Sequence, residues 1–142
     1  MGKGNNHTLV IHSELNHLKL LRSFFDEIFK EYKISESNLN RFLLCVSEGV
    51  TNAVVHGNNS DSEKYVKVNV CLQGNEITVE VSDEGDGFNF KDIPNPTCIE
   101  NIKKEAGRGL FIIQSYADKV DFENNGSTLK FKFNLSGDTV LQ

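Results

Sequence analysis

Alternation of apolar and polar residues in the second half of the chain is the feature that most constrains its fold. In residues 66–81, valine, leucine and isoleucine occupy every second position on both sides of a Gly-Asn turn. Residues 120–135 contain an Asn-Gly turn, after which leucine and phenylalanine alternate with lysine and asparagine. Both segments are therefore predicted to be β-hairpins, each with one buried face.

Helices with one apolar face are predicted to cover these hairpins. Residues 18–29 carry an apolar stripe, and residues 39–57 are predicted to form a longer helix. A third helix is predicted to begin at the glycines near residue 107 and to end near Lys119, and residues 9–11 are predicted to form an edge strand. The predicted fold is an α/β two-layer sandwich, with a mixed, mostly antiparallel sheet and all three helices on one face.

The composition is that of an ordinary globular chain. Its 142 residues are 38% hydrophobic and 25% charged, so we expect one domain over residues 1–142 with a core from about residue 8 to residue 135. The net charge of −5 argues against a nucleic-acid groove, and no apolar run approaches membrane-spanning length. Cys45, Cys71 and Cys98 lack the spacing of a metal site, which favours reduced thiols in a cytoplasm.

Glu48 and Asn52 lie four residues apart on a helix that has a polar face as well as an apolar one. With a step of about 100° per residue, Asn52 and His56 fall within about 80° of Glu48, and most apolar residues gather on the opposite side. Such pairs also occur on solvated helices, and a histidine near a helix end can simply stabilise that end. Apolar residues that interrupt the polar face favour a ligand pocket over open water.

The first hairpin runs directly into the acidic, glycine-rich turn Asp83-Glu84-Gly85-Asp86-Gly87. An ionised carboxylate accepts hydrogen bonds and donates none, so Asp83 at a strand end can recognise the exocyclic amine of adenine. Glycine lets a planar base approach the backbone. The turn alone is also compatible with an acidic surface loop, but together with the polar helix face it predicts an ATP site.

Residues 89–106 show no periodicity, contain two prolines and lead into Gly107-Arg108-Gly109-Leu110. A long irregular stretch in a small domain is typical of a lid or a binding loop. The glycines are predicted to open a helix whose backbone N–H groups favour phosphate, with the guanidinium of Arg108 beside them. The neighbouring pair of lysines, at residues 103 and 104, could reach the same anion or serve only solubility.

These motifs, in this order, resemble the N, G1 and G2 boxes and the later Gly-x-Thr strand of the GHKL ATPases. That superfamily includes gyrase, the ninety-kilodalton heat-shock chaperones, histidine kinases and mismatch-repair ATPases, and the resemblance implies its Bergerat-type ATP-binding fold. Within this superfamily, the chain resembles the stand-alone, RsbW-like anti-sigma-factor serine kinases of bacteria. The resemblance lies in the compact size and in the motifs Thr-Asn-Ala-x-x-His-Gly and Gly-Arg-Gly-Leu-Phe. The motifs are carried by Glu48, Asn52, His56 and Gly57, by residues 83–88, by residues 107–110, and by Gly126, Ser127 and Thr128.

The resemblance implies a role for each matching residue on the helix. Glu48 would be the general base that takes a proton from a serine hydroxyl of a protein substrate or from water. Asn52 would be an oxygen ligand of Mg²⁺, which bridges the phosphates of ATP. His56 would lie on the phosphate side of the site.

The resemblance also divides the remaining residues between the base and the phosphates. Asp83 would bind the adenine amine, with Thr128 joining through an ordered water, and Gly85 and Gly87 would bring the backbone close to the base. No motif of the family is missing from the chain. The residues that would hold the phosphates as the lid closes are Gly107, Arg108, Gly109 and Leu110.

The leading expectation from the resemblance is a cytoplasmic, ATP- and magnesium-dependent serine kinase of a partner-switching module. It would phosphorylate a small anti-sigma antagonist of the STAS type, sequester a sigma factor or another regulated protein, and form a homodimer, without binding nucleic acid or a membrane directly. Two alternatives stay open. The protein could use ATP only to stabilise a partner-binding shape, with little or no phosphotransfer. It could also be a histidine-kinase catalytic domain separated from its phosphoacceptor, although it lacks the long helix pair of that class.

Overall fold

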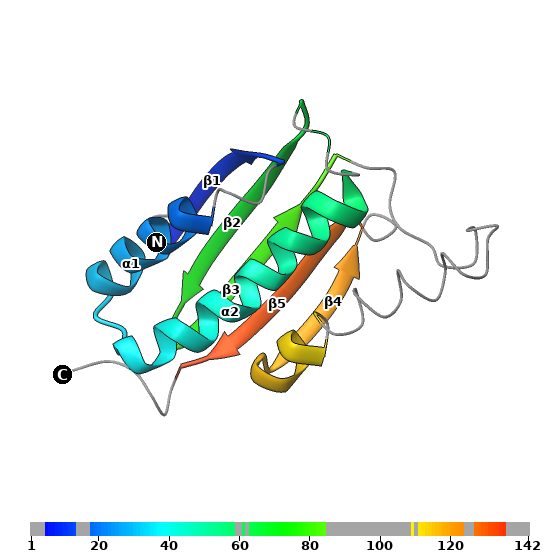
Figure 1. The fold of residues 1–142 in the computed structure, drawn as a ribbon. Coiled ribbons are helices and arrows are strands. Elements are labelled where there is room, and N and C mark those ends of the chain that lie inside the picture. Colours follow the sequence, from blue (N-terminus) through cyan, green and yellow to red (C-terminus); the bar gives the residue numbers. More distant parts are fainter. Residues whose placement is uncertain are drawn as a thin grey trace.

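The computed structural model describes residues 5–13, 18–58, 61, 63–84, 109, 111–123 and 127–135. In these residues, five strands form one sheet, and the helices α1 and α2 lie across one of its faces (Figure 1). Residues 111–116 form a further short helix. The elements are β1 (Asn6–His12), α1 (Leu18–Glu31), α2 (Glu36–Asn52), the π-helix η3 (Ala53–Gly57), β2 (Tyr65–Gln73), β3 (Glu76–Ser82), β4 (Lys119–Glu123) and β5 (Thr128–Asn134).

The sheet has the strand order β1-β2-β3-β5-β4, and each of the four described pairings is antiparallel. β2 and β3 form the first predicted hairpin, in which Gly74 has a φ of 62°, a conformation that glycine adopts without strain. β4 and β5 form the second predicted hairpin, and β5 also pairs with β3. Both predicted hairpins are confirmed, and the predicted edge strand is the longer β1.

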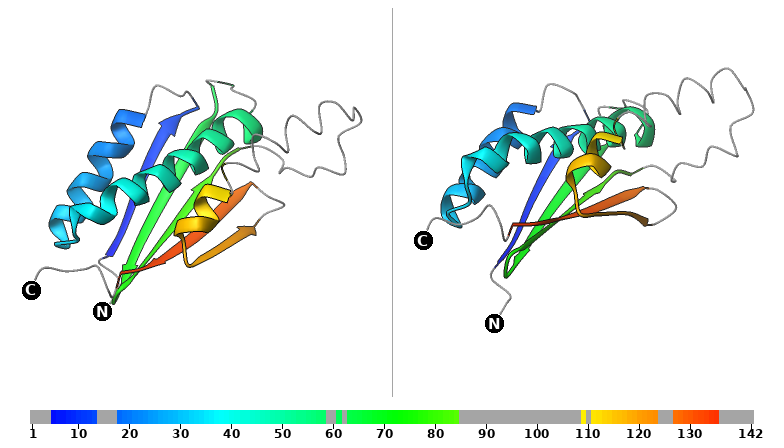
Figure 2. Two further views of the ribbon diagram at one scale, coloured as in Figure 1. Left: turned by 60° about the horizontal axis from the view of Figure 1, so that its bottom comes forward. Right: turned by 90° about the horizontal axis from the view of Figure 1, so that it is seen from below.

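All the described helices cover the same face of the sheet, as Figure 2 shows for α1, α2 and residues 111–116. α2 begins after Ser35, whose side-chain oxygen accepts a hydrogen bond of 3.2 Å from the backbone nitrogen of Ser37 and caps the helix. The predicted two-layer α/β fold is therefore confirmed. Within the described ranges, every helix is too short or too polar to cross a membrane.

The third helix is shorter than predicted. The apolar spacing predicts that it reaches Lys119, but the helix ends at Tyr116 and β4 begins at Lys119. The reason is a hydrogen bond of 2.8 Å from the backbone nitrogen of Asp118 to the carbonyl oxygen of Lys132, which already joins the chain to β5. Pairing with a neighbouring strand requires extended backbone, and this tertiary contact overrides the local helical pattern.

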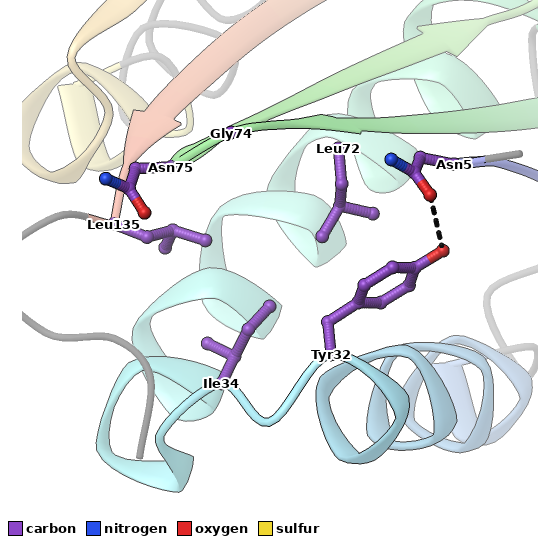
Figure 3. Close-up of a pocket in the computed structure, with 7 residues that line it drawn as sticks. All are labelled: Asn5, Tyr32, Ile34, Leu72, Gly74, Asn75 and Leu135. Carbon is purple, nitrogen blue, oxygen red and sulfur yellow. Dashed lines mark hydrogen bonds between the residues drawn. The ribbon is translucent and has the colours of Figure 1, made fainter. Parts of the chain in front are cut away.

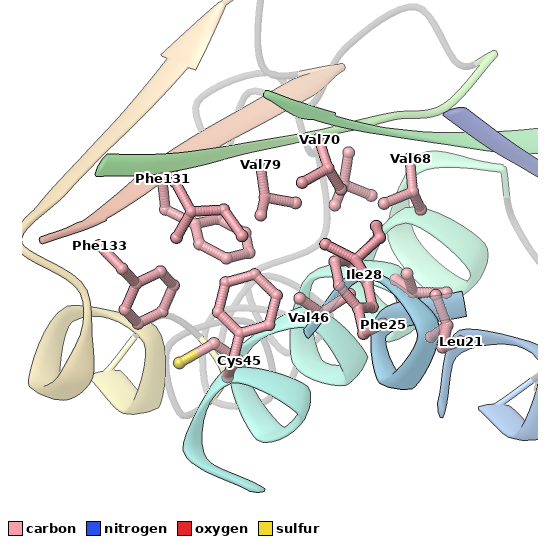
Figure 4. Packing of buried hydrophobic residues seen from close by; sticks show 14 of the residues in the cluster. Leu21, Phe25, Ile28, Cys45, Val46, Val68, Val70, Val79, Phe131 and Phe133 are labelled. Atoms are coloured by element: carbon pink, nitrogen blue, oxygen red, sulfur yellow. The ribbon is translucent and has the colours of Figure 1, made fainter. Parts of the chain in front are cut away.

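The core lies between the sheet and the helices and is rich in phenylalanine (Figure 4). The ring centroid of Phe42, on α2, lies 4.9 Å from the centroids of both Phe25 and Phe133. These contacts join α1, α2 and β5 and add to the stabilisation that comes from burying apolar area. The residues predicted for the apolar face of α2 are buried, apart from the half-buried Leu43: Leu39, Phe42, Val46, Val50, Ala53 and Val54.

α2 packs directly on the sheet at Gly49. A Cβ added at Gly49 would lie 3.4 Å from Leu129 on β5 and 3.5 Å from Val81 on β3. Val81 is close to the end of β3, and Leu129 is close to the start of β5. The C-terminal part of α2 therefore lies over the end of the sheet at which β3 finishes and β5 begins.

Candidate functional site

Glu48 and Asn52 lie on the same side of α2, one turn apart, and both are half-buried. Gly109, far away in the sequence, is buried against them. A Cβ added at Gly109 would lie 3.0 Å from Oε1 of Glu48 and 3.2 Å from Nδ2 of Asn52. The backbone at residue 109 thus reaches the polar face of α2, and the structure brings these three predicted site residues together.

Asp83 and Thr128 also come together, at the end of the sheet beneath this part of α2. Ser82, the last residue of β3, pairs with Thr128, the first residue of β5, and their hydroxyl oxygens lie 3.2 Å apart. The backbone nitrogen of Asp83 donates to the carbonyl oxygen of Ser127 at 2.9 Å. The ladder between β3 and β5 therefore holds the two residues that are predicted to recognise adenine next to each other.

α2 continues into the single π-helical turn η3 and ends at Gly57, the position predicted for the end of the helix. The next residue, Asn58, is fully buried, and its backbone nitrogen donates to the carbonyl oxygen of Ala53 at 2.8 Å. Single π-turns occur frequently at functional sites. No motif marks Asn58 in the sequence, because a polar residue after a helix-ending glycine is typical of a surface loop.

Several predicted site residues lie outside the described residues. The structure places the backbone of His56 in η3 but does not describe its side chain. The predicted lid at residues 89–106 also lies outside the described ranges. The other predicted site residues outside them are Gly85, Gly87, Gly107, Arg108 and Leu110.

Cys45 lies on α2 one turn before Glu48 and is completely buried. Burial raises the pKa of the Cys45 thiol to about 11, while the charge of Arg41 lowers it and the charge of Glu48 raises it. The thiol beneath the candidate site is therefore protonated at neutral pH. A protonated and buried thiol is a poor nucleophile.

We expect Cys45 to resist thiol reagents in the folded protein at about pH 8, while the half-buried Cys71 reacts. The pKa of Cys45 is raised from 9.0 to about 11 on folding, so the folded state favours the protonated thiol. The stabilisation that comes from this preference is fully present below about pH 9. That contribution is lost as the pH rises from about 9 to about 11. Mass spectrometry of labelled peptides, and urea unfolding of the wild type and Cys45→Ala across this range, measure both effects. Labelling of Cys45 as fast as Cys71 without urea would contradict the burial.

A separate pocket of about 120 Å³ lies at the opposite end of the sheet, beside the turn between β2 and β3 (Figure 3). The hydroxyl of Tyr32 at its edge hydrogen-bonds with His7 at 3.0 Å and with Asn5 at 3.4 Å. None of the predicted site residues lines this pocket, so it is distinct from the candidate site. Its lining consists of Asn5, Tyr32, Ile34, Leu72, Gly74, Asn75 and Leu135.

Known proteins have a similar sequence or a similar fold. A sequence model of the histidine kinase-like ATPase domain matches residues 11–133. The chain belongs to this family. Anti-sigma F factors of Bacillus thuringiensis (strain Al Hakam) and Bacillus cereus (strain AH187) are each 32% identical to this chain over 101 residues. The matched region covers 68% of this chain and 69% of each anti-sigma F factor.

A solved structure has a similar fold. The crystal structure of the RsbU and RsbW domains of a Mycobacterium tuberculosis protein matches this histidine kinase-like ATPase domain with a TM-score of 0.66 and 19% sequence identity. The match covers 92% of this chain and 32% of the other, so this chain spans about a third of that structure. At this identity the likeness shows the fold alone, and it agrees with the predicted fold class.

Proposed function

We propose that this histidine kinase-like ATPase domain is an ATP-dependent protein serine kinase and anti-sigma factor of a bacterial partner-switching module. The observation that carries the proposal is the proximity of the Gly109 backbone to the side chains of Glu48 and Asn52. A carboxylate, an amide and a glycine backbone therefore lie close together, an arrangement that could serve the transfer of a phosphoryl group. Membership of an ATPase family and similarity to anti-sigma F factors support the proposal.

The residues around Gly109 suit the phosphates of ATP and a magnesium ion. The space that a Cβ at Gly109 would fill is bordered by the Glu48 carboxylate and by the Asn52 amide, whose Oδ1 would lie 3.6 Å from it. Asn52 would hold Mg²⁺ through Oδ1, because a hard cation prefers oxygen ligands and keeps several waters. When bound, Mg²⁺ would neutralise charge on the phosphates. We assign the remaining phosphate contacts to Gly107, Arg108, Gly109, Leu110 and His56.

Glu48 is the proposed general base. Its carboxylate would accept the proton of the serine hydroxyl while the serine oxygen forms a bond to the γ-phosphorus. The bond from that phosphorus to the oxygen that bridges the β- and γ-phosphates breaks in the same step, and ADP leaves. α2 supports this role, because the helix is packed on the sheet at Gly49 and keeps the neighbouring carboxylate in place.

Asp83 and Thr128 are proposed to bind adenine. The Asp83 carboxylate would accept a hydrogen bond from the exocyclic amine, and Thr128 would join through an ordered water. Guanine carries a carbonyl oxygen at the corresponding position, so two acceptors would face each other and GTP would be rejected. Gly85 and Gly87 would let the base approach the backbone.

The proposed partners are a small anti-sigma antagonist of the STAS type, which carries the acceptor serine, and a sigma factor. The name of the Bacillus relatives, anti-sigma F factor, supports this choice. We further propose that residues 1–142 form one domain that acts as a cytoplasmic homodimer. The alternatives are a target other than a sigma factor and a module that binds ATP with little or no phosphotransfer.

Incubation with labelled ATP, magnesium and candidate antagonists tests the proposed reaction. We expect the label on one serine of the antagonist, and none on an antagonist in which that serine is replaced by alanine. Label on a histidine would indicate a separated histidine-kinase domain instead. If ATP binds and strengthens capture of a partner but no residue is labelled, the protein is a binding module.

A further inference from the structure

Asn58 joins three segments that are far apart in the sequence. Its side chain is completely buried. Nδ2 donates to the carbonyl oxygen of Tyr65 at 3.0 Å, and Oδ1 accepts from the backbone nitrogen of Glu84 at 2.8 Å. The end of η3, the start of β2 and the turn after β3 therefore meet at one amide group. The partners fix the orientation of this amide, because one is a carbonyl acceptor and the other is an N–H donor.

Two further hydrogen bonds close the network. The backbone nitrogen of Asn58 donates to Ala53 in the π-turn, and the carboxylate of Glu84 accepts from the backbone nitrogen of Tyr65. A buried amide that loses one of its partners leaves a polar group unsatisfied, which costs free energy. None of the three segments can therefore move away from the others without breaking a hydrogen bond of this network.

Asp83 lies between two anchored positions. Its backbone nitrogen donates a hydrogen bond of 2.9 Å to the carbonyl oxygen of Ser127. The backbone nitrogen of the next residue, Glu84, donates a hydrogen bond to Oδ1 of Asn58. Asn58 itself directly follows η3, the continuation of the helix that carries Glu48. The Asn58 side chain is thus a direct link between the strand end that carries Asp83 and the helix that carries the polar face.

We infer that Asn58 is a positioning residue for purine recognition, which sets the place of Asp83 relative to the polar face of α2. The inference rests on the proposed function, in which Asp83 binds adenine while Glu48 and Asn52 face the phosphates. ATP binds tightly only if both groups are held at the separation that a single nucleotide spans. A loosened link weakens recognition of the base and leaves the phosphate contacts in place.

Asn58→Ala removes both side-chain hydrogen bonds and tests the inference with two probes, ATP and inorganic tripolyphosphate, each with magnesium. Affinity for ATP falls about tenfold in calorimetric titrations, because Asp83 no longer has a fixed place. Affinity for tripolyphosphate, which has no base, changes by less than about twofold. General damage to the fold would weaken both probes together.

Leu72→Ala is the matched control. It removes a buried side chain at the other end of β2, far from the Asn58 network, and lowers stability. At a temperature at which both variants are folded, Leu72→Ala keeps the wild-type affinity for both probes. Unchanged ATP affinity in Asn58→Ala, or an equal loss of both probes, overturns the role of Asn58. A wild-type protein that does not bind ATP overturns the proposed function instead.

Hydrogen exchange of the wild type provides a second test, which is needed if Asn58→Ala does not fold. The amides of Glu84 and Tyr65 donate within the network. Their exchange slows when ATP is bound and stays at the free-protein rate with tripolyphosphate, because only the base engages Asp83. Exchange that is the same with both ligands contradicts the inference.

Discussion

Glu48→Gln is expected to slow phosphorylation of the antagonist about a thousandfold and to leave the affinity for ATP within about threefold of wild type. Glutamine keeps the shape of the side chain beside Gly109 but cannot accept the serine proton at neutral pH. Single-turnover transfer of labelled phosphate measures the rate, and calorimetry measures the affinity. The two readouts separate a defect in proton transfer from a defect in nucleotide binding.

Glu80→Gln is the control for this substitution. It removes a carboxylate from β3, where Oε2 of Glu80 lies 3.8 Å from Nζ of Lys130 in a partly exposed ion pair. Because such pairs contribute little to stability, this variant should keep the wild-type rate. A Glu48→Gln protein that phosphorylates its partner at the wild-type rate would rule out Glu48 as the general base.

Gly109→Ala is expected to lower the phosphorylation rate about a hundredfold, while the free energy of unfolding changes by less than about 1 kcal/mol. The added methyl group would lie 3.0 Å from Oε1 of Glu48 and 3.2 Å from Nδ2 of Asn52, closer than ordinary packing allows. Both atoms are at the ends of side chains that can move away, so the fold tolerates the change. The catalytic geometry does not, because a displaced base no longer reaches the acceptor hydroxyl.

Gly49→Ala adds the same methyl group next to Glu48 but on the buried side of α2. There its contacts begin at 3.4 Å and are with Leu129 and Val81, so an ordinary van der Waals fit is expected. Replacing a glycine inside a helix also favours the helix by up to about 1 kcal/mol. Gly49→Ala should therefore keep its activity. If Gly109→Ala is as active as Gly49→Ala, the proximity of Gly109 to the two side chains has no role in phosphotransfer.

The hairpins and the buried side of α2 could be predicted from the sequence, because they depend on local periodicity. A period of two residues fixes which face of a strand is buried, and an angle of about 100° per residue does the same for a helix. The strand order could not be predicted in this way. β5 lies between β3 and β4, and pairing between distant segments leaves no local pattern. The early end of the third helix has the same cause, since Asp118 pairs with Lys132.

In the candidate site, too, the features that depend on local sequence pattern could be predicted, and those that depend on tertiary contacts could not. The spacing of Glu48 and Asn52 is a local pattern, and the position of Asp83 after a strand could be predicted from alternation. The proximity of Gly109 to α2 is a tertiary feature. Only the resemblance to a known family predicted that Gly109 and the polar face of α2 belong to one site. Asn58 illustrates the limit, because its importance comes from burial and from two distant backbone partners.

Calorimetric titration of the protein and of Asp83→Asn with magnesium and ATP is the most direct test of the central claim, that one pocket binds adenine at Asp83 and phosphate beside Glu48 and Asn52. We predict that one ATP binds per chain, that GTP does not compete, and that Asp83→Asn weakens the affinity for ATP at least about tenfold. A wild-type protein that gives no binding heat and no competition with any adenine nucleotide would contradict the claim. So would an Asp83→Asn variant that binds ATP as tightly as the wild type.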